Sequence, residues 1–335
     1  MAEQVNWKKW WLRVFVLLVL VMIAIGGITR LTRSGLSIVE WKPVSGIIPP
    51  LSDEAWQAQF ELYQKSPEFL QVNSHFGIED YKDIFIWEYL HRVLGRIIFL
   101  FTLIPGLILW RRKLVTLQLV LLLSGLVALQ GLIGWLMVKS GLNHAPHVSP
   151  FMLALHFFSA LTVALVAHFH MSKMRAPLLV DLSDSQKLLM RTFGIVLLIQ
   201  IFYGCLTSGW KAGFAFNTYP LMGGDFFPPG GWLQEPGWVN LFSNPATVQW
   251  VHRWLAFVVL LLAVFGTRSF IKSPHWSQMK GPLIHLLGVI GAQILLGIFN
   301  IIYGVPIWLA VAHQLVASLL VITYFGIYVR LSRAT

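Results

Sequence analysis

The 335-residue sequence has a single cysteine and few charged side chains. One cysteine cannot form an intrachain disulfide, and a metal site built from cysteines is not expected. Charged residues make up 12% of the chain and hydrophobic residues 56%. Apolar runs of about 20 residues recur, which is the length that a helix needs to cross a hydrocarbon core about 30 Å thick. The sequence therefore predicts an all-α polytopic membrane protein surrounded by lipid.

Acidic residues are also scarce, with 14 against 25 basic residues and a net charge of +11. We expect eight spans, at 11–29, 84–110, 115–138, 149–171, 188–208, 246–267, 281–302 and 304–328. With the N-terminus inside, the inner segments hold 15 of the 25 basic residues and three of the 14 acidic residues. The positive-inside rule then places both termini in the cytoplasm. The positive charge thus indicates topology, and no nucleic-acid partner is expected.

The N-terminal segment MAEQVNWKKWWLRVF lacks the small-residue cleavage site of a secretory signal. It also lacks the Ser- and Arg-rich composition of a transit peptide. We therefore expect the first apolar run to stay in the protein as a helix. A bacterial cytoplasmic (inner) membrane fits this N-terminus better than an organelle reached by import.

The two halves of the chain resemble each other. Outer segments 30–83 and 209–245 each begin with a Thr/Ser/Gly turn and later reach a Pro-Pro pair. The following motifs also match, in the order WEYLHR (87–92) with VQWVHR (248–253), QGLIG (130–134) with QILLG (293–297), and ALHFFSA (154–160) with VAHQLVA (311–317). Because each repeat has four spans, both repeats start on the same side of the membrane. We expect two parallel four-helix bundles, at 1–175 and 176–335.

Four of the eleven histidines occupy equivalent places in the two halves, namely His91, His156, His252 and His313. Each lies about six to nine residues into an even-numbered span, roughly 9–14 Å below the outer surface. A small residue follows each histidine four positions later on the same helix face, as Gly95, Ala160, Ala256 and Ala317. Axial ligation of two haem irons requires two imidazole pairs at one depth, and four-helix bundles often hold such cofactors.

Simpler explanations of these histidines carry less weight. A single membrane histidine often only bonds to a neighbouring helix, but four repeat-matched histidines favour metal ligation. Zinc or copper is disfavoured because neither half offers a third soft or carboxylate ligand near its pair.

One difference between the halves indicates chemistry. Three residues before the first histidine of each half, the N-terminal half has Glu88 and the C-terminal half has Gln249. Glu88 shares a helix face with His91, so its carboxylate could accept a proton or stabilise a cation developing on a bound porphyrin. An ion pair with Arg92 is the structural alternative. Possible partners of haem propionates, or of Glu88, are Arg92, Arg96 and Arg253.

At these residues the chain resembles the haem A synthase family. The matching elements are GGITRLTRSGLSIVEWKPVSGIIPP (26–50), IFIWEYLHRVLGR (84–96), LQGLIGWLMVKSGL (129–142), LHFFSALTVAL (155–165), AGFAFNTYPLM (212–222), VQWVHRWLA (248–256) and VAHQLVASLL (311–320). Some members carry paired cysteines in outer loops, and this chain resembles the cysteine-free class. The resemblance implies oxidation of the C8 methyl group of haem O to a formyl group by successive hydroxylations, in the synthesis of haem A for terminal oxidases.

The resemblance also implies an assignment of the two histidine pairs. His252 and His313 would ligate a haem b cofactor, whereas His91 and His156 would face the substrate haem O, with Glu88 catalytically important. Haem O synthase and assembly factors of the oxidase follow as partners from this function alone, and a homo-oligomer is compatible with the sequence. A di-haem, quinol-linked cytochrome b without chemistry of its own is the main alternative. A secondary transporter is disfavoured, because Pro105 is the only proline deep in a span.

Overall fold

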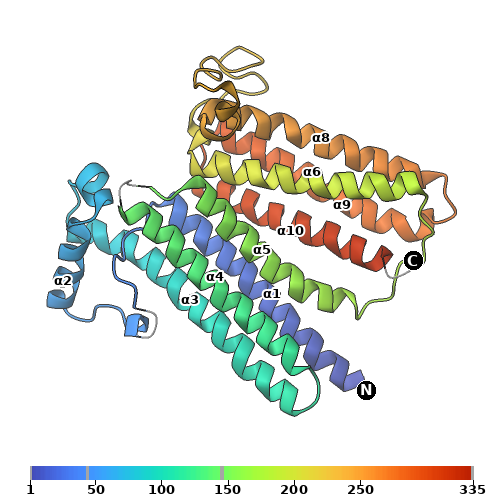
Figure 1. Cartoon of the computed structure of the whole chain (residues 1–335), viewed down its shortest axis with the longest axis horizontal. Coiled ribbons are helices and arrows are strands. Elements are labelled where there is room, and N and C mark those ends of the chain that lie inside the picture. The colour runs from blue at the N-terminus through green and yellow to red at the C-terminus, as the bar shows by residue number, and fades with distance from the viewer. Residues whose placement is uncertain (1, 43–44, 144–146, 333–335) are drawn as a thin grey trace. The chain divides into compact units, whose positions relative to one another are not determined.

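Eight long helices dominate the computed structural model, which describes the chain except residues 1, 43–44, 144–146 and 333–335 (Figure 1). They are α1 (Ala2–Leu31), α3 (Ile78–Arg111), α4 (Leu117–Asn143), α5 (Pro150–Ser172), α6 (Asp184–Gly209), α8 (Pro245–Ile271), α9 (Trp276–Ile302) and α10 (Ile307–Leu331). Each contains a segment long and apolar enough to cross a membrane. The predicted all-α fold with eight spans is therefore confirmed.

Some helices extend past the apolar segments that the sequence marks. α3 starts at Ile78, six residues before the expected span, because the polar segment EDYKD continues the helix outward. Its first turn is capped by Asp80, whose Oδ2 accepts a hydrogen bond from the Gly77 amide at 2.9 Å. α6 begins at Asp184 in the same way, after a capping box formed by Ser183 and Gln186. Polar capping, rather than hydropathy, sets these boundaries.

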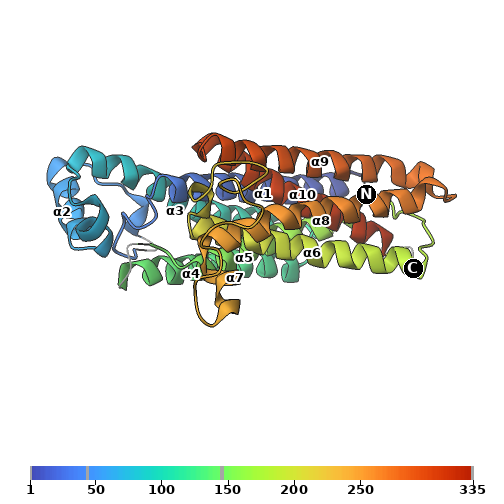
Figure 2. The same cartoon turned by 90° about the horizontal axis from the view of Figure 1, so that it is seen from above.

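The chain divides into two units, Met1–Ala167 and His168–Thr335. Within the first unit, α3 packs against both α1 and α4. Within the second, α8 packs against both α6 and α9, and α10 packs against α9 (Figure 2). The expected boundary at 175/176 and the parallel relation of the repeats stay predictions.

The outer segment of the first unit contains an amphipathic helix, α2 (Asp53–Gln64), beside an aromatic cluster. Phe60 and Tyr63 of α2 pack there against Tyr81 and Phe85 at the start of α3. The Tyr63 hydroxyl donates to Glu68 at 3.3 Å and accepts a hydrogen bond from the Asn73 amide at 2.8 Å. Burial raises the pKa of Tyr63, so this hydroxyl stays protonated and keeps the contact at physiological pH. This cluster fixes α2 onto the outer end of α3.

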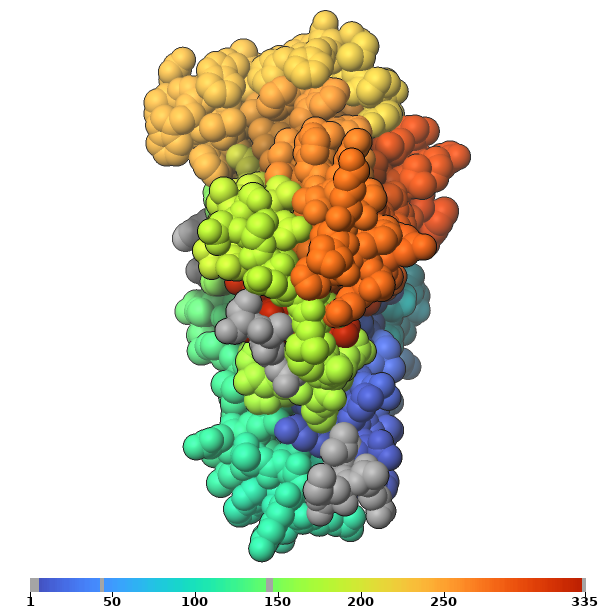
Figure 3. Space-filling view, turned by 90° about the vertical axis from the view of Figure 1, so that its right-hand side faces the viewer, coloured from blue at the N-terminus to red at the C-terminus, as the bar shows by residue number. Residues whose placement is uncertain are grey.

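The outer segment of the second unit has only short helices, η3 (Ala212–Phe214), η4 (Gly237–Val239) and α7 (Asn240–Ser243). Buried Asn240 organises it: its Oδ1 accepts from the amides of Leu233 and Gln234, and its Nδ2 donates to the carbonyls of Gln234 and Gly237. In the space-filling view this yellow-to-orange segment projects beyond α6 and α8 (Figure 3). The outer segments of the two units thus differ, because only the first contains a helix as long as α2.

Candidate functional site with two histidine pairs

The structure brings His91 of α3 and His156 of α5 together within the first unit. Their ring centroids lie 6.5 Å apart, with 50° between the ring planes. In the second unit, His252 of α8 and His313 of α10 have ring centroids 6.3 Å apart, with 86° between the planes. All four residues are partly buried. The pairing predicted from the repeats is therefore present in both units.

The separation within each pair fits a single metal ion between two imidazoles. Two imidazoles on opposite sides of one metal have centroids about 6.3 Å apart, given metal–nitrogen bonds of about 2.0–2.1 Å and roughly 1.1 Å from nitrogen to centroid. Nδ1 of His252 and Nδ1 of His313 are buried without a hydrogen-bond partner among the described residues. Such atoms usually indicate a missing ligand or water. The second pair thus fits axial ligation of a haem iron.

A glycine of a neighbouring helix faces each histidine ring. A Cβ atom built on Gly26 would lie 3.2 Å from Nε2 of His91, and one built on Gly134 would lie 2.9 Å from Cε1 of His156. In the second unit, Gly204 and Gly297 place such an atom 3.1 Å from Cε1 of His252 and of His313, respectively. Any larger residue would displace the ring, so the four glycines set the room for the histidines.

The role of these glycines was not predicted from the sequence. The small residues that were predicted lie on the histidines' own helices, and of these Ala160 and Ala317 are buried. The signal for the partner glycines was nevertheless available, because QGLIG and QILLG end at Gly134 and Gly297. The contacts that they make run between helices, which a motif within one helix does not reveal.

Glutamine side chains line both pairs. The Gln130 amide nitrogen donates to the His156 carbonyl at 2.9 Å and lies 3.2 Å from its Nδ1. Gln293, the repeat equivalent of Gln130, places its amide nitrogen 3.2 Å from Nε2 of His313. Gln200 donates to the His252 carbonyl at 3.0 Å. Gln130 and Gln293 thus contact the rings, whereas Gln200 holds the backbone of His252. Among the described residues no cluster of three or more His, Cys, Asp or Glu could hold a metal ion.

Glu88 is 3% exposed and both of its carboxylate oxygens are hydrogen-bonded. Oε2 accepts from the Ser37 hydroxyl at 2.8 Å and from the Ile38 amide at 2.7 Å. Oε1 accepts from Nε and Nη2 of Arg92, at 3.1 and 2.6 Å. The ion pair with Arg92 that the sequence left as an alternative is thus present. Glu88 also connects α3 to the outer segment.

Arg92 extends this connection through its guanidinium. Nη2 donates to the Ile38 carbonyl at 2.8 Å, and Nη1 donates to the Glu40 carbonyl at 3.1 Å. Arg96, one turn further along α3, donates to the Lys42 carbonyl at 2.9 Å. Together with Glu88, these residues form what we call the first clamp, a set of α3 side chains that holds backbone of segment 37–42.

The second unit contains an equivalent set, the second clamp. Nη1 and Nη2 of Arg253 donate to the carbonyls of Thr218 and Phe216, at 2.7 and 2.6 Å. Gln249 donates to the same Phe216 carbonyl at 3.1 Å. Glu88 accepts hydrogen bonds from the outer segment of the first unit, whereas Gln249 donates a hydrogen bond to the outer segment of the second unit. The Glu/Gln difference that suggested a catalytic carboxylate therefore also has a structural reason.

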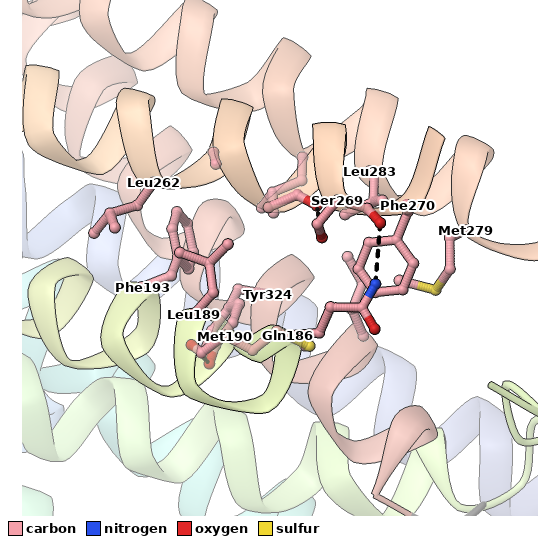
Figure 4. A pocket seen from close by; sticks show the side chains of 14 residues that line it. Gln186, Leu189, Met190, Phe193, Leu262, Ser269, Phe270, Met279, Leu283 and Tyr324 are labelled. Atoms are coloured by element: carbon pink, nitrogen blue, oxygen red, sulfur yellow. Dashed lines mark hydrogen bonds between the residues drawn. The ribbon is translucent and has the colours of Figure 1, made fainter. Parts of the chain in front are cut away.

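A separate small cavity of about 40 Å³ lies in the second unit, away from the histidines (Figure 4). It is lined mostly by apolar side chains of α6, α8, α9 and α10, including Phe193 and Leu283. The Gln186 amide donates to the Ser269 carbonyl at its rim, at 3.2 Å. Such a volume accommodates a water molecule, not a porphyrin. The histidine pairs remain the candidate site.

The fold and the site together define a polytopic helical membrane protein with two histidine pairs. A family model described as "Cytochrome oxidase assembly protein" matches residues 9–325 of the chain. The chain therefore belongs to this family. Among its relatives is the "Heme A synthase" of Rhodopseudomonas palustris (strain BisA53), 38% identical over 95% of this chain and 89% of the relative. The "Heme A synthase" of Beijerinckia indica subsp. indica is 41% identical over 92% of this chain and 88% of the relative. The "Heme A synthase" of Rhodospirillum centenum (strain ATCC 51521 / SW) is 41% identical over 91% of this chain and 83% of the relative.

Proposed function

We propose that this protein is a haem A synthase, an oxidoreductase that converts the C8 methyl group of haem O to a formyl group. The observation that carries the proposal is the pair of bis-histidine centres in a chain whose relatives have that name. Two successive hydroxylations of the methyl carbon give a geminal diol, which loses water to leave the aldehyde. Haem A formed in this way serves terminal oxidases, and oxidase assembly factors are the proposed downstream partners.

His252 and His313 would hold a haem b cofactor through its iron. Their spacing, their buried unpartnered Nδ1 atoms and the room left by Gly204 and Gly297 all suit this role. When bound, a haem supplies one-electron redox chemistry that amino-acid side chains lack. The protein's own contribution is to hold the two rings in place and to exclude larger side chains from the space between the helices.

His91 and His156 are the proposed site of the substrate haem O, which haem O synthase supplies. Gln130 orients His156, and Gly26 and Gly134 leave room beside the two rings. A methyl C–H bond does not yield to simple acid–base chemistry, so the substrate must be held in a fixed orientation next to a redox centre. The α3 and α5 helices provide that orientation through one histidine each.

Glu88 is the proposed catalytic residue, and its contacts favour one of its two candidate roles. All four of its hydrogen bonds come from donor groups. Taking up a proton would weaken one of these bonds. Stabilising positive charge that develops at the porphyrin methyl carbon requires no such loss. We therefore assign Glu88 to charge stabilisation rather than to proton transfer. Arg92, Arg96 and Arg253 remain candidate propionate partners as well as clamp residues.

Extraction of the haems from the purified protein tests the function. Protein made in cells that supply haem O should retain haem O or haem A in addition to haem b. His252→Ala or His313→Ala should deplete haem b, and His91→Ala or His156→Ala should deplete haem O and haem A. Haem b alone, even with haem O supplied, would instead indicate the di-haem cytochrome. The proposed site of action is the bacterial cytoplasmic membrane.

A further inference from the structure

The first unit contains an open cavity of about 250 Å³ between α3, the C-terminal end of α4 and the outer segment. It is lined by Val39, Trp41, Arg92, Trp135, Val138, Lys139 and Leu142. The volume is below the range of about 300–1,000 Å³ that encloses a whole drug-sized ligand. The cavity therefore suits one end of a larger molecule.

Two cations and two indoles meet in this cavity. The Lys139 ammonium lies 5.2 Å from the centroid of Trp135, and the Arg92 guanidinium lies 5.6 Å from the centroid of Trp41. The two indole rings are 6.3 Å apart. Lys139 is also exposed. Stacking of a cation on an indole holds it in place without neutralising its charge. The wall of the cavity is thus aromatic and carries positive charge.

The two cations differ in how their charge is matched. Arg92 is paired with the Glu88 carboxylate and bonded to two backbone carbonyls. Lys139 forms no ion pair within the part of the chain that the structure describes. A buried or half-buried anion in the cavity would find its partner in Lys139. The chemistry that fits is a carboxylate attached to a flat, apolar body.

The position of Lys139 relates it to the histidine pair of the same unit. Lys139 lies five residues beyond Gly134, the α4 residue that faces His156. At 1.5 Å per residue this is about 7.5 Å along the helix axis, on the side of the outer segment. A porphyrin has both propionates on one edge. With its iron at the level of the histidines, that edge would reach the level of Lys139.

The second unit lacks this arrangement. In the alignment of QGLIG with QILLG, Trp135 corresponds to Ile298 and Lys139 corresponds to Ile302. Among the described residues, a cation lies over an indole only in the unit that we assign to the substrate.

We propose that Lys139, stacked on Trp135, binds a propionate of the substrate porphyrin and fixes the orientation in which it reacts. This inference rests on the proposed function. The C8 methyl group is adjacent to a propionate-bearing ring carbon, so anchoring that propionate also anchors the reacting carbon. The apolar tail of haem O then points away from the outer segment. Lys139 is a positioning residue, because it contacts the carboxylate rather than the reacting carbon.

Equilibrium binding to the full-length protein tests the proposal without measuring turnover. Haem O and its propionate dimethyl ester are titrated, and the retained haem is extracted and quantified by chromatography. Lys139→Gln should weaken haem O binding about tenfold and leave binding of the ester unchanged, and Lys139→Arg should restore most of the loss. Lys82→Gln is the matched control, since Lys82 also lies over an indole, 5.7 Å from Trp56, but outside the cavity. It should leave both affinities unchanged.

Three results would overturn the proposal. The first is an unchanged affinity of the Lys139→Gln variant for haem O. The second is an equal loss of affinity for haem O and for its dimethyl ester in this variant. The third would be loss of the Lys139 effect when phosphatidylglycerol, but not phosphatidylcholine, is added, which would identify a lipid phosphate as the occupant. Failure of the proposed function is distinguishable, because haem O binding would then be insensitive to His91→Ala and His156→Ala as well.

Discussion

At the scale of single residues, glycines decide whether the histidines can occupy their positions. Gly297 and its three counterparts have no side chain where a Cβ atom would meet an imidazole at 2.9–3.2 Å. Contacts this short require the neighbour to move, and a ring that must also bind a metal has little freedom to do so. These glycines act through the side chain that they lack, so they are not found among metal-ligating residue types.

Gly297→Val should therefore remove most of the haem b absorbance per protein, because the added carbons would displace His313. Gly291→Val is the matched control in the same helix, since a Cβ atom at Gly291 meets nothing within 4 Å. Both variants place the same β-branched residue in α9, so effects on helix propensity cancel. Equal loss of absorbance in both variants would contradict the role of Gly297.

Glu88 presents a second question at this scale, because it is both a clamp residue and the proposed catalytic group. Glu88→Gln should keep the haem b spectrum and lower conversion of haem O by about 100-fold, as expected for loss of a preorganised charge. Ser37→Ala removes one hydrogen bond from the clamp but keeps the charge, and should lower conversion less than about tenfold. Haem A formed per protein is the measurement. A loss in Ser37→Ala as large as that in Glu88→Gln would leave Glu88 with the structural role alone.

At the scale of elements, arginines on the helices hold the outer segments by their backbone. Arg253 is 7% exposed and donates to carbonyls of Phe216 and Thr218. Such charge-assisted bonds to the backbone are stronger than neutral ones, and they do not depend on which side chains the loop carries. The outer segments can thus differ in sequence between the two units while both are held by an arginine bonded to backbone carbonyls.

Arg253→Met should release segment 210–244 while the helices stay folded. Loss of two charge-assisted hydrogen bonds corresponds to about 2–5 kcal/mol of local stability, enough to raise the rate of proteolysis in this segment more than about tenfold. Limited proteolysis in detergent measures the effect, and circular dichroism checks the helices. Arg268→Met, an exposed change in the last turn of the same helix, should leave the rate unchanged. Equal cleavage of the two variants would refute the clamp.

At the scale of the whole molecule, the sequence predicts topology through its charges. By the expected boundaries, 15 of the 25 basic residues fall in the segments predicted to be inside, and 11 of the 14 acidic residues fall in the rest of the chain. An even number of spans per half predicts the same orientation for both halves.

Reporter fusions test this topology. A reporter that is active only in the cytoplasm should be active when fused after Arg330 and inactive when inserted near Gly224 in the outer segment. The inverse pattern would overturn the assignment of both termini to the cytoplasm. A fusion after Lys113, in the loop between α3 and α4, should behave like the C-terminal fusion, which controls for effects of the C-terminus itself.

Hydrophobic runs, basic clusters and internal repeats already determined eight helices and four matched histidines. This was sufficient because a helix in lipid must satisfy its own backbone and is therefore readable from local composition. The tertiary structure decided which atoms meet: the glycines that face the histidines, the loop groups that hold Glu88, and the indoles beside Lys139. Those contacts join residues far apart in the chain, such as Ser37 and Glu88, and no local pattern specifies them. The packing of the helices against one another and against the outer segments specifies these contacts.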